Sequence, residues 1–312
     1  MRYIITALMA STALPALADV PAVITDIPPV HSLVAQVMGD LGAPVLLLEK
    51  GASEHGFQLR PSQAAAVAGA DLVVWIGPEL TPWLDRALET RDPTSAALAL
   101  LDAPGTLTRG YDEPHATHED HATEGHDQEH EAESHDHDHE GTDPHAWLDP
   151  ANGKLWLGLI AAELARLDPE NAATYAANAE AAAREIDALD AEVTAILAPV
   201  KDRPIVLFHD AYSYFADHYG LAVAGTIALG DASSPGAQRL DALRTTVSAG
   251  GAVCLFPEVQ HDPALVAQIA DGTAARIGGS LDPVGSSLEP GPAAYAALLG
   301  GLARTLADCA GK

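Results

Sequence analysis

The sequence has few basic residues and few cysteines, and each shortage excludes classes of protein. Only 16 Lys and Arg stand against 44 Asp and Glu in 312 residues, giving a formal net charge of -28. Nucleic acids and anionic membrane surfaces require a basic protein surface, so both are excluded as partners. Two cysteines exclude a disulfide-dense scaffold and any metal site built from four cysteines. Fourteen histidines, by contrast, are many, and an acidic chain attracts cations.

Common catalytic motifs are absent as well. The chain has no G-x-S-x-G elbow, no P-loop and no G-x-G-x-x-G that opens a helix. The stretch from His118 to His121 is one residue short of the H-E-x-x-H zinc-protease motif, and it lies where no helix is expected. There is no internal repeat of the solenoid kind. These absences argue against the common hydrolases and nucleotide-binding enzymes.

Residues 1–18 are predicted to be a secretory signal peptide. Arg2 precedes a short apolar run over 4–17, and Ala16-Leu17-Ala18 fits a small-x-small cleavage site. The alternative is a buried N-terminal helix. The run is too short to span a bilayer, and no cysteine follows the cleavage site to carry a lipid. The mature chain is therefore expected to begin near Asp19 and to lie in the periplasm.

Export affects the interpretation of Cys254 and Cys309. In an oxidising compartment the two cysteines either form one disulfide or remain as two buried thiols. A bridge that closes their loop of 55 residues would contribute about 4 kcal/mol in the chain-entropy model.

Short apolar runs alternate with Ala-rich helical stretches, which predicts parallel sheets covered by helices. We expect an N-terminal lobe over 19–167, a linking helix over 168–198 and a C-terminal lobe over 199–312. In the first lobe the pattern predicts strands at 22–25, 44–48 and 71–77 and helices at 31–39, 61–69, 81–90 and 151–167. In the second it predicts strands at 204–208, 222–227 and 252–256 and helices at 240–249, 263–270 and 293–306. Without internal Gly or Pro, 169–197 would form a rigid helix about 45 Å long. The fold class is α/β, with two lobes joined by this helix.

Residues 112–143 differ in kind from the rest of the chain. They contain 13 Asp and Glu, eight His and no Lys or Arg. A segment with almost no apolar side chains cannot offset the entropy of ordering, so we expect a disordered loop inserted in the first lobe. Its histidines are His115, His118, His121, His126, His130, His135, His137 and His139.

Three histidines outside this segment fall where α/β folds bind ligands. His209 directly follows the apolar strand expected at 204–208, at its carboxyl end. His145 lies just before a helix that Asp149 and Pro150 begin. His55 lies in a loop after the second expected strand.

A carboxylate would complete the set. Asp282, in an Asp-Pro turn, is the candidate fourth ligand, and Glu54, adjacent to His55, is the alternative. Three imidazoles and one carboxylate suit Zn²⁺, whereas Mn²⁺ prefers more oxygen ligands.

The motifs together resemble the metal-binding solute receptors of ABC importers, and more narrowly the ZnuA-type zinc receptors. The resemblance covers essentially the whole mature chain in order. It rests on the segments at 51–55, 59–62, 71–77, 143–150, 208–212 and 281–283. It implies a metal site in the cleft between the lobes, with His55 and His145 from the first lobe and His209 from the second.

The resemblance also bears on the remaining ligand and on the cysteines. Asp282 matches the carboxylate of many relatives. In some zinc receptors a glutamate beside the first histidine, or a water, takes this place, and Glu54 keeps this alternative open. Manganese receptors generally replace one histidine by glutamate, and here all three are histidine. The His-rich insertion is typical of the zinc branch, and the Cys254/Cys309 pair resembles a disulfide found there.

The function implied is a monomeric periplasmic receptor that captures Zn²⁺. It would deliver the ion to an inner-membrane permease driven by a cytoplasmic ATPase, with periplasmic zinc chaperones as further partners. The His-rich loop would be an auxiliary zinc collector, or else a solvated linker that binds metal adventitiously. An enzyme with Glu54 as base and a periplasmic zinc store are the competing hypotheses. His31, His218 and His261 are assigned surface or structural roles, and Trp147 and Tyr212 are expected to pack beneath the site.

Overall fold

The computed structural model describes residues 20–91, 95–111, 141–228 and 235–312. The predicted signal peptide, and all of the predicted loop before Gly141, lie outside the described residues. Within the described ranges, no helix combines the length and the apolar character needed to cross a membrane.

The first lobe contains a parallel sheet in the order β2-β1-β3-β4. Its elements are β1 (Val23–Thr25), β2 (Val45–Leu46), β3 (Leu72–Trp75) and β4 (Ala96–Ala99), with α2 (Pro61–Gly69) and α3 (Pro82–Leu88) beside them. All of β3 is buried, as expected of a central parallel strand covered on both faces. The strands expected at 22–25, 44–48 and 71–77 are confirmed. β4 was not predicted, because three of its four residues are alanine, which favours strands weakly.

The second lobe repeats the arrangement, with a parallel sheet in the order β10-β9-β7-β8. Its elements are β7 (Ile205–Leu207), β8 (Val223–Thr226), β9 (Cys254–Leu255) and β10 (Arg276–Ile277), with α6 (Ser213–Tyr219), α7 (Ala237–Thr246) and α8 (Ala264–Ala270). Cys254 and Cys309 form a disulfide with Cα atoms 6.3 Å apart. The bridge fixes β9 to the C-terminal helix.

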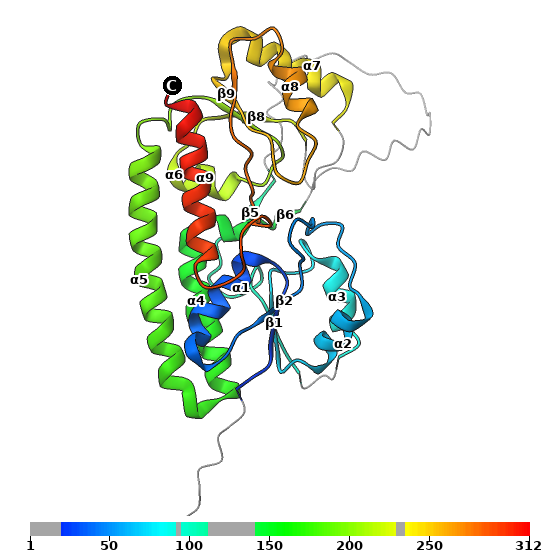
Figure 1. The fold of residues 1–312 in the computed structure, drawn as a ribbon, viewed down its shortest axis with the longest axis vertical. Coiled ribbons are helices and arrows are strands. Elements are labelled where there is room, and N and C mark those ends of the chain that lie inside the picture. The colour runs from blue at the N-terminus through cyan, green and yellow to red at the C-terminus, as the bar shows by residue number, and fades with distance from the viewer. Residues whose placement is uncertain (1–19, 92–94, 112–140, 229–234) are drawn as a thin grey trace, which may run out of the picture.

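Four helices pack together along one side of both lobes (Figure 1). They are α1 (Pro28–Met38), α4 (Pro150–Leu167), α5 (Ala172–Leu197) and α9 (Ala294–Ala310). The 26 residues of α5 span about 39 Å. Pro169–Asn171 form a separate 3-10 turn, so the long helix begins later than predicted. Its buried residues recur every three or four positions, which gives one apolar face toward α4, α1 and α9.

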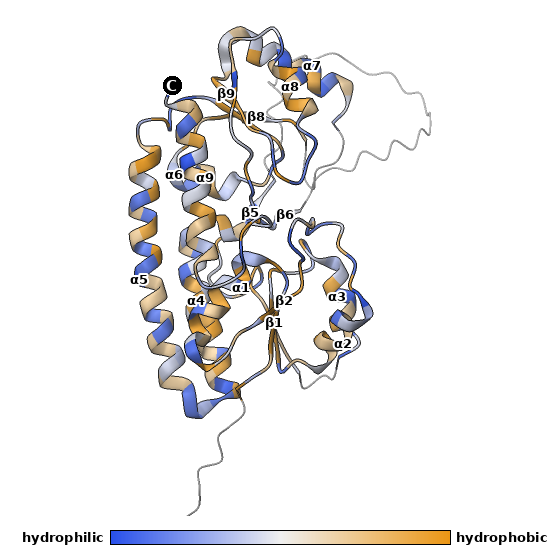
Figure 2. Ribbon diagram, in the orientation of Figure 1, coloured by the Kyte–Doolittle hydropathy of each residue, from blue (hydrophilic) through white to orange (hydrophobic). Residues whose placement is uncertain are grey.

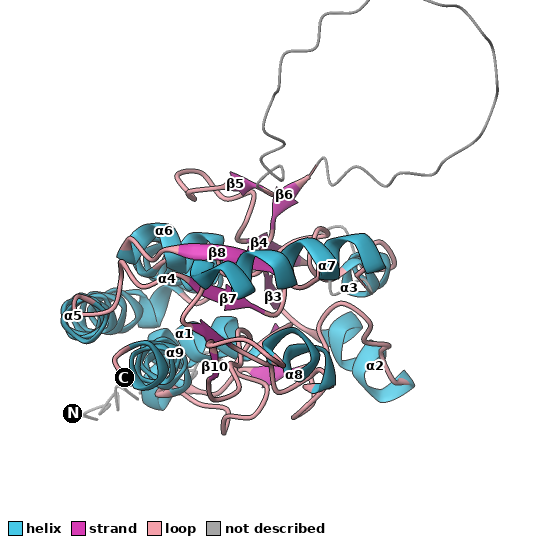
Figure 3. Ribbon diagram, turned by 90° about the horizontal axis from the view of Figure 1, so that it is seen from above, coloured by secondary structure: helices cyan, strands magenta, loops and turns pink. Residues whose placement is uncertain are grey.

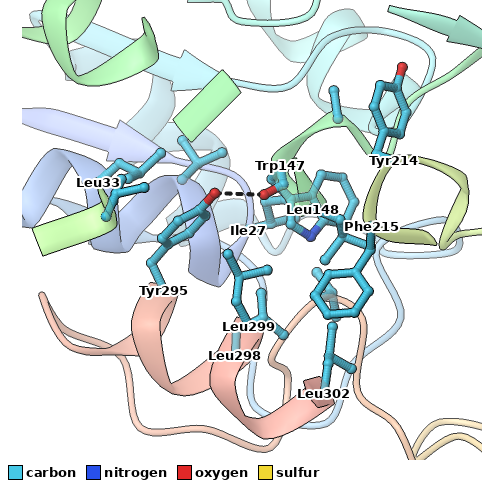
Figure 4. Close-up of a cluster of buried hydrophobic side chains, with 14 of the residues drawn as sticks. Ile27, Leu33, Trp147, Leu148, Tyr214, Phe215, Tyr295, Leu298, Leu299 and Leu302 are labelled. Carbon is cyan, nitrogen blue, oxygen red and sulfur yellow. Dashed lines mark hydrogen bonds between the residues drawn. The ribbon is translucent and has the colours of Figure 1, made fainter. Parts of the chain in front are cut away.

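The core extends from one lobe to the other (Figure 4). Strands of both lobes are hydrophobic in Figure 2, including β1, β8 and β9. Between the lobes, Tyr295 of α9 donates a hydrogen bond to the carbonyl of Trp147 at 2.9 Å. The Trp147 indole in turn donates to the Pro283 carbonyl at 2.8 Å. The turn that follows His145 is thereby fixed by residues far along the chain.

An antiparallel ribbon, formed by β5 (Arg109–Gly110) and β6 (Thr142–Asp143), lies beside α6 (Figure 3). Tyr214 of α6 accepts a hydrogen bond from the Arg109 backbone N–H at 2.8 Å and donates to the Asp143 carbonyl at 2.8 Å. The ribbon pairs residues just before the His-rich segment with its last two residues, and it ends two residues before His145.

Candidate metal centre

The three histidines singled out from the sequence converge. One ring nitrogen from each of His55, His145 and His209 lies within 4.8 Å of the others. Their ring centroids are 5.7 Å apart for His55 and His145, 5.5 Å for His145 and His209, and 6.4 Å for His55 and His209. His145 is fully buried and His209 is 2% exposed. The cluster joins segments that are up to 154 positions apart in the chain.

His209 is fixed by the register of the second sheet. It follows the end of β7, and Glu258 follows the end of the neighbouring parallel strand β9. The carboxyl ends of parallel strands share one edge of a sheet, so the two side chains meet there. Glu258 oxygens lie 2.7 and 2.8 Å from His209 Nδ1, and Tyr212 donates to Glu258 at 3.0 Å. Because Nδ1 is bound to Glu258, Nε2 is the nitrogen that would ligate a metal.

His145 is held in the same manner by Asp143. The Asp143 Oδ1 accepts from the backbone N–H of His145 at 3.0 Å and from its Nδ1 at 2.7 Å. His145 Nε2 is buried and has no hydrogen-bond partner among the described residues. A buried polar nitrogen without a partner costs free energy, which a metal ligated at this atom would remove. As expected, Asp149 caps the next helix by accepting from Ala151 N at 2.8 Å.

His55 lies on the loop between β2 and α2 and is the most accessible of the three, with 15% of its side chain exposed. Its neighbour Glu54 is almost fully buried, and Glu54 Oε1 lies 3.6 Å from His55 Nε2. The Glu54 carbonyl accepts from the Trp83 indole at 2.7 Å. From the second lobe, Gln260 donates to Glu54 at 3.3 Å and to the Ala52 carbonyl at 2.8 Å.

Asp282 has other partners. Its carboxylate accepts hydrogen bonds from the backbone N–H groups of Ser286 and Ser287 at 2.9 and 2.8 Å, and from their hydroxyls at 3.3 and 2.6 Å. In the described part of the chain, its carboxylate does not join the set of ligand atoms that lie within 4.8 Å of one another in the three histidines. In this conformation the side chain organises its own turn, and Glu54 is the carboxylate adjacent to the ligand set.

The remaining described histidines differ in their surroundings. His31 is bound to the Pro44 carbonyl at 3.2 Å, and burial lowers its pKa. His261 stacks on Phe208 with centroids 4.4 Å apart, and its ring centroid lies 6.0 Å from that of His209. It is thus closer to the metal cluster than a surface role implied. Trp147 and Tyr212 pack against ligand rings as expected, 5.2 Å from His145 and 6.1 Å from His209.

Sequence reasoning missed the two carboxylates behind the ligands. Asp143 is part of the motif at 143–150, and its position two residues before His145 is a local signal. Glu258 follows a buried strand, as His209 does, but only the order of strands in the sheet shows that they are neighbours.

The donor set determines the chemistry. Three imidazole nitrogens from two lobes suit a borderline divalent cation such as Zn²⁺. Two of the rings, His145 and His209, are also bound through Nδ1 to a carboxylate, as is common behind metal ligands. Manganese sites are typically richer in oxygen ligands. The arrangement is suited to binding a transition-metal ion.

Known proteins agree with this chemistry. Residues 23–309 match the family described as "Zinc-uptake complex component A periplasmic", ZnuA. The chain is 51% identical to a high-affinity zinc uptake system protein ZnuA of Paracoccus denitrificans, over 99% of this chain and 97% of that one. It is 40% identical to the protein of the same name from Brucella suis, over 93% and 92%.

Solved structures show the same architecture. A crystal structure of a ZnuA deletion mutant with zinc bound has a TM-score of 0.74 and 26% identity, covering 93% of this chain and 98% of that one. The FpvC protein of Pseudomonas aeruginosa in complex with Mn²⁺ has a TM-score of 0.76 at 19% identity, covering 94% and 99%, and so shows the fold alone.

Proposed function

The chain belongs to the ZnuA family of periplasmic zinc-uptake components, and from this premise we propose that His55, His145 and His209 bind one Zn²⁺ between its two lobes. The observation that carries the proposal is the convergence of three imidazole nitrogens from both lobes within 4.8 Å. The buried, unpartnered Nε2 of His145 supports it.

The protein is a zinc-binding receptor that supplies an ABC-type importer, and it is not an enzyme. Its partners are the importer's membrane permease and, through it, the ATPase. We assign residues 1–18 to a cleavable signal peptide that directs the chain to the periplasm. We further propose that the receptor is a monomer and that periplasmic zinc chaperones exchange zinc with it.

We propose Glu54 as the carboxylate that approaches the bound ion, in place of Asp282. Glu54 is buried, and its Oε1 already lies 3.6 Å from His55 Nε2, whereas four hydrogen bonds occupy the Asp282 carboxylate. Zinc titrations of Glu54→Gln and Asp282→Asn against a chelator of known affinity separate the two. A larger loss of affinity for Asp282→Asn would reverse the assignment.

The His-rich segment is proposed to be an auxiliary, low-affinity zinc collector. Its eight histidines stand among 13 acidic residues, which attract cations. The proposal is supported by the β5–β6 ribbon, which pairs residues just before the segment with its last two residues, including the Asp143 that binds His145.

The function is tested by titrating the mature protein with Zn²⁺ and Mn²⁺ in competition with a chelator. We expect one tight zinc site and much weaker binding of Mn²⁺ to it, because neutral imidazoles favour the later metal. Equal affinity for the two metals would contradict the zinc assignment. Metal-dependent turnover of esters or peptides by the pure protein would contradict the receptor assignment.

A further inference from the structure

Asp143 is a buried carboxylate with contacts in both lobes. Its Oδ1 accepts two hydrogen bonds from His145, from the backbone N–H and from Nδ1. Its Oδ2 accepts from the hydroxyl of Ser213, and its backbone carbonyl accepts from the hydroxyl of Tyr214. Ser213 and Tyr214 begin α6, which follows β7 of the second sheet. The residue therefore connects a ligand of the first lobe to a helix of the second.

This contact determines which nitrogen of His145 is available to a metal. A carboxylate accepts hydrogen bonds and does not donate them, so Nδ1 of the neutral imidazole must carry the proton. The lone pair then lies on Nε2, the buried nitrogen of the ligand cluster. A carboxylate behind a ligating imidazole also fixes the orientation of the ring.

Glu258 holds His209 in a comparable way but within one lobe. Its carboxylate contacts His209, Tyr212 and, at 3.6 Å, His261, and these three residues all belong to the second lobe. Asp143 differs because half of its hydrogen bonds come from the opposite lobe. Ser213, the first residue that supplies those bonds, lies four residues after His209. The connection from β7 to α6 therefore contains one ligand, His209, and also holds the carboxylate that supports another ligand, His145.

We propose that Asp143 is a positioning residue through which α6 of the second lobe holds His145 in its metal-binding orientation. The proposal rests on the proposed zinc site. When the lobes are in contact, Ser213 fixes Oδ2 of Asp143, and Oδ1 is then directed at His145 Nδ1. When the lobes separate, Asp143 loses the two bonds from α6 and His145 loses its rigid support. Retention of zinc is thereby coupled to contact between the lobes.

The decisive variant is Ser213→Ala, which removes the hydroxyl from α6 and leaves both ligand and carboxylate in place. We expect zinc release, followed by stopped flow with an excess of chelator, to become about 10-fold faster. Ser32→Ala is the matched control. Ser32 is fully buried, whereas Ser213 is half-buried, and the Ser32 hydroxyl joins α1 to the Pro292 carbonyl at 2.9 Å and not to Asp143. It should lower thermal stability without changing zinc release.

Asp143→Asn tests the positioning role itself. We expect zinc affinity to fall about 10- to 100-fold. In the Co²⁺-loaded protein we expect the ligand-field absorption bands to shift, since these bands report the ligand geometry of each bound ion and not the stability of the fold. Zinc release from Ser213→Ala at the wild-type rate overturns the proposal, and this variant decides the matter even if Asp143→Asn does not fold. Absence of tight zinc binding in the wild-type protein would instead overturn the proposed function.

Discussion

The two lobes present their histidines by different means. In the second lobe, His209 and its partner Glu258 follow adjacent parallel strands, and the register of the sheet holds them. In the first lobe, His55 lies on a loop and His145 directly precedes a 3-10 turn before α4. The carboxylates beside these two, Glu54 and Asp143, accept hydrogen bonds from Gln260 and Ser213 of the other lobe.

The difference indicates that the second lobe's half of the site is built within that lobe, whereas the first lobe's half is completed by contact between lobes. Strand ends are fixed by backbone hydrogen bonds, while loops take their conformation from whatever packs against them. The second lobe should therefore capture the ion with little rearrangement, and the first lobe should determine how long the ion is held.

The largest effect is expected when a ligand is lost from either lobe. His55→Ala, His145→Ala and His209→Ala should each weaken the tight site by more than the roughly 10- to 100-fold typical of losing a partner behind a ligand. No neighbouring side chain can supply a second imidazole. Chelator-competition titrations measure this effect. If His55→Ala binds zinc as the wild type does, the contribution of the loop ligand is refuted.

Removal of the disulfide should lower the stability of the second lobe but have little effect on zinc affinity. The double variant Cys254→Ser, Cys309→Ser should lose about 2–5 kcal/mol of stability, because the bridge closes a loop of 55 residues. Urea unfolding of the zinc-free protein measures the loss. Since the bridge joins β9 to α9 and includes none of the three histidines, zinc affinity below the unfolding range should change little. A large loss of affinity would show that the half-site depends on the bridge.

Loss of the carboxylate behind His209 should be independent of contact between lobes. Glu258→Gln is expected to weaken zinc binding about 10- to 100-fold. In the double variant Glu258→Gln, Ser213→Ala, the two losses of zinc binding free energy should add. In the double variant Asp143→Asn, Ser213→Ala they should not add, because both substitutions break one shared hydrogen-bond network. A double-mutant cycle on zinc affinity measures both couplings. Equal coupling energies in the two cycles would contradict the claim that only the first lobe's half of the site depends on contact between the lobes.

A smaller effect is expected on the stability of the fold, where α6 packs against the start of α4 and against α5, and it should depend on pH. His218 of α6 lies 3.1 Å from Asp149 and 2.9 Å from Asp190, and these carboxylates raise its pKa, Asp149 first. Its stabilisation should be complete below the usual pKa near 6.5 and should be lost as pH rises through the higher native value. His218→Gln should therefore cost up to about 1 kcal/mol at pH 6 and less at higher pH. Urea unfolding of zinc-free protein across this range tests the sign, and a cost that grows with pH would contradict it.

The smallest effect on the tight site should come from deleting residues 115–139, which removes all eight loop histidines. The weak zinc sites should disappear, and the affinity of the site between the lobes should stay unchanged, because none of its three histidines lies in the deleted stretch. Calorimetric titration gives the number and affinity of the sites. If the tight site is lost too, the assignment of tight binding to the lobes is wrong.

Much of the fold could be predicted from local patterns. The apolar runs at β1, β3 and β7, the Pro61 start of α2 and the Asp149-Pro150 cap of α4 are local signals, and the structure confirms these elements. The structure also confirms the pairing of Cys254 with Cys309. β4 and β10 were missed because an alanine-rich or two-residue strand is defined by its neighbours in the sheet.

The site was predictable only in part. His209 and His145 could be found because each lies at a junction that the sequence marks, and the motifs identified His55. The role of Asp282 could not be judged, because only the structure shows that Ser286 and Ser287 bind its carboxylate. His261 gave no signal in the sequence, because its proximity to His209 depends on which strands are adjacent.

The sequence by itself determined the class of protein and the candidate ligands, since motif order and side-chain chemistry can be read without the fold. Only the tertiary structure decided which carboxylates stand behind the ligands. Asp143 reaches Ser213 across 70 positions of the chain, and Glu258 reaches His209 across 49. Such contacts follow from the order of strands and the packing of α6 against the ribbon, and no short segment of sequence contains them.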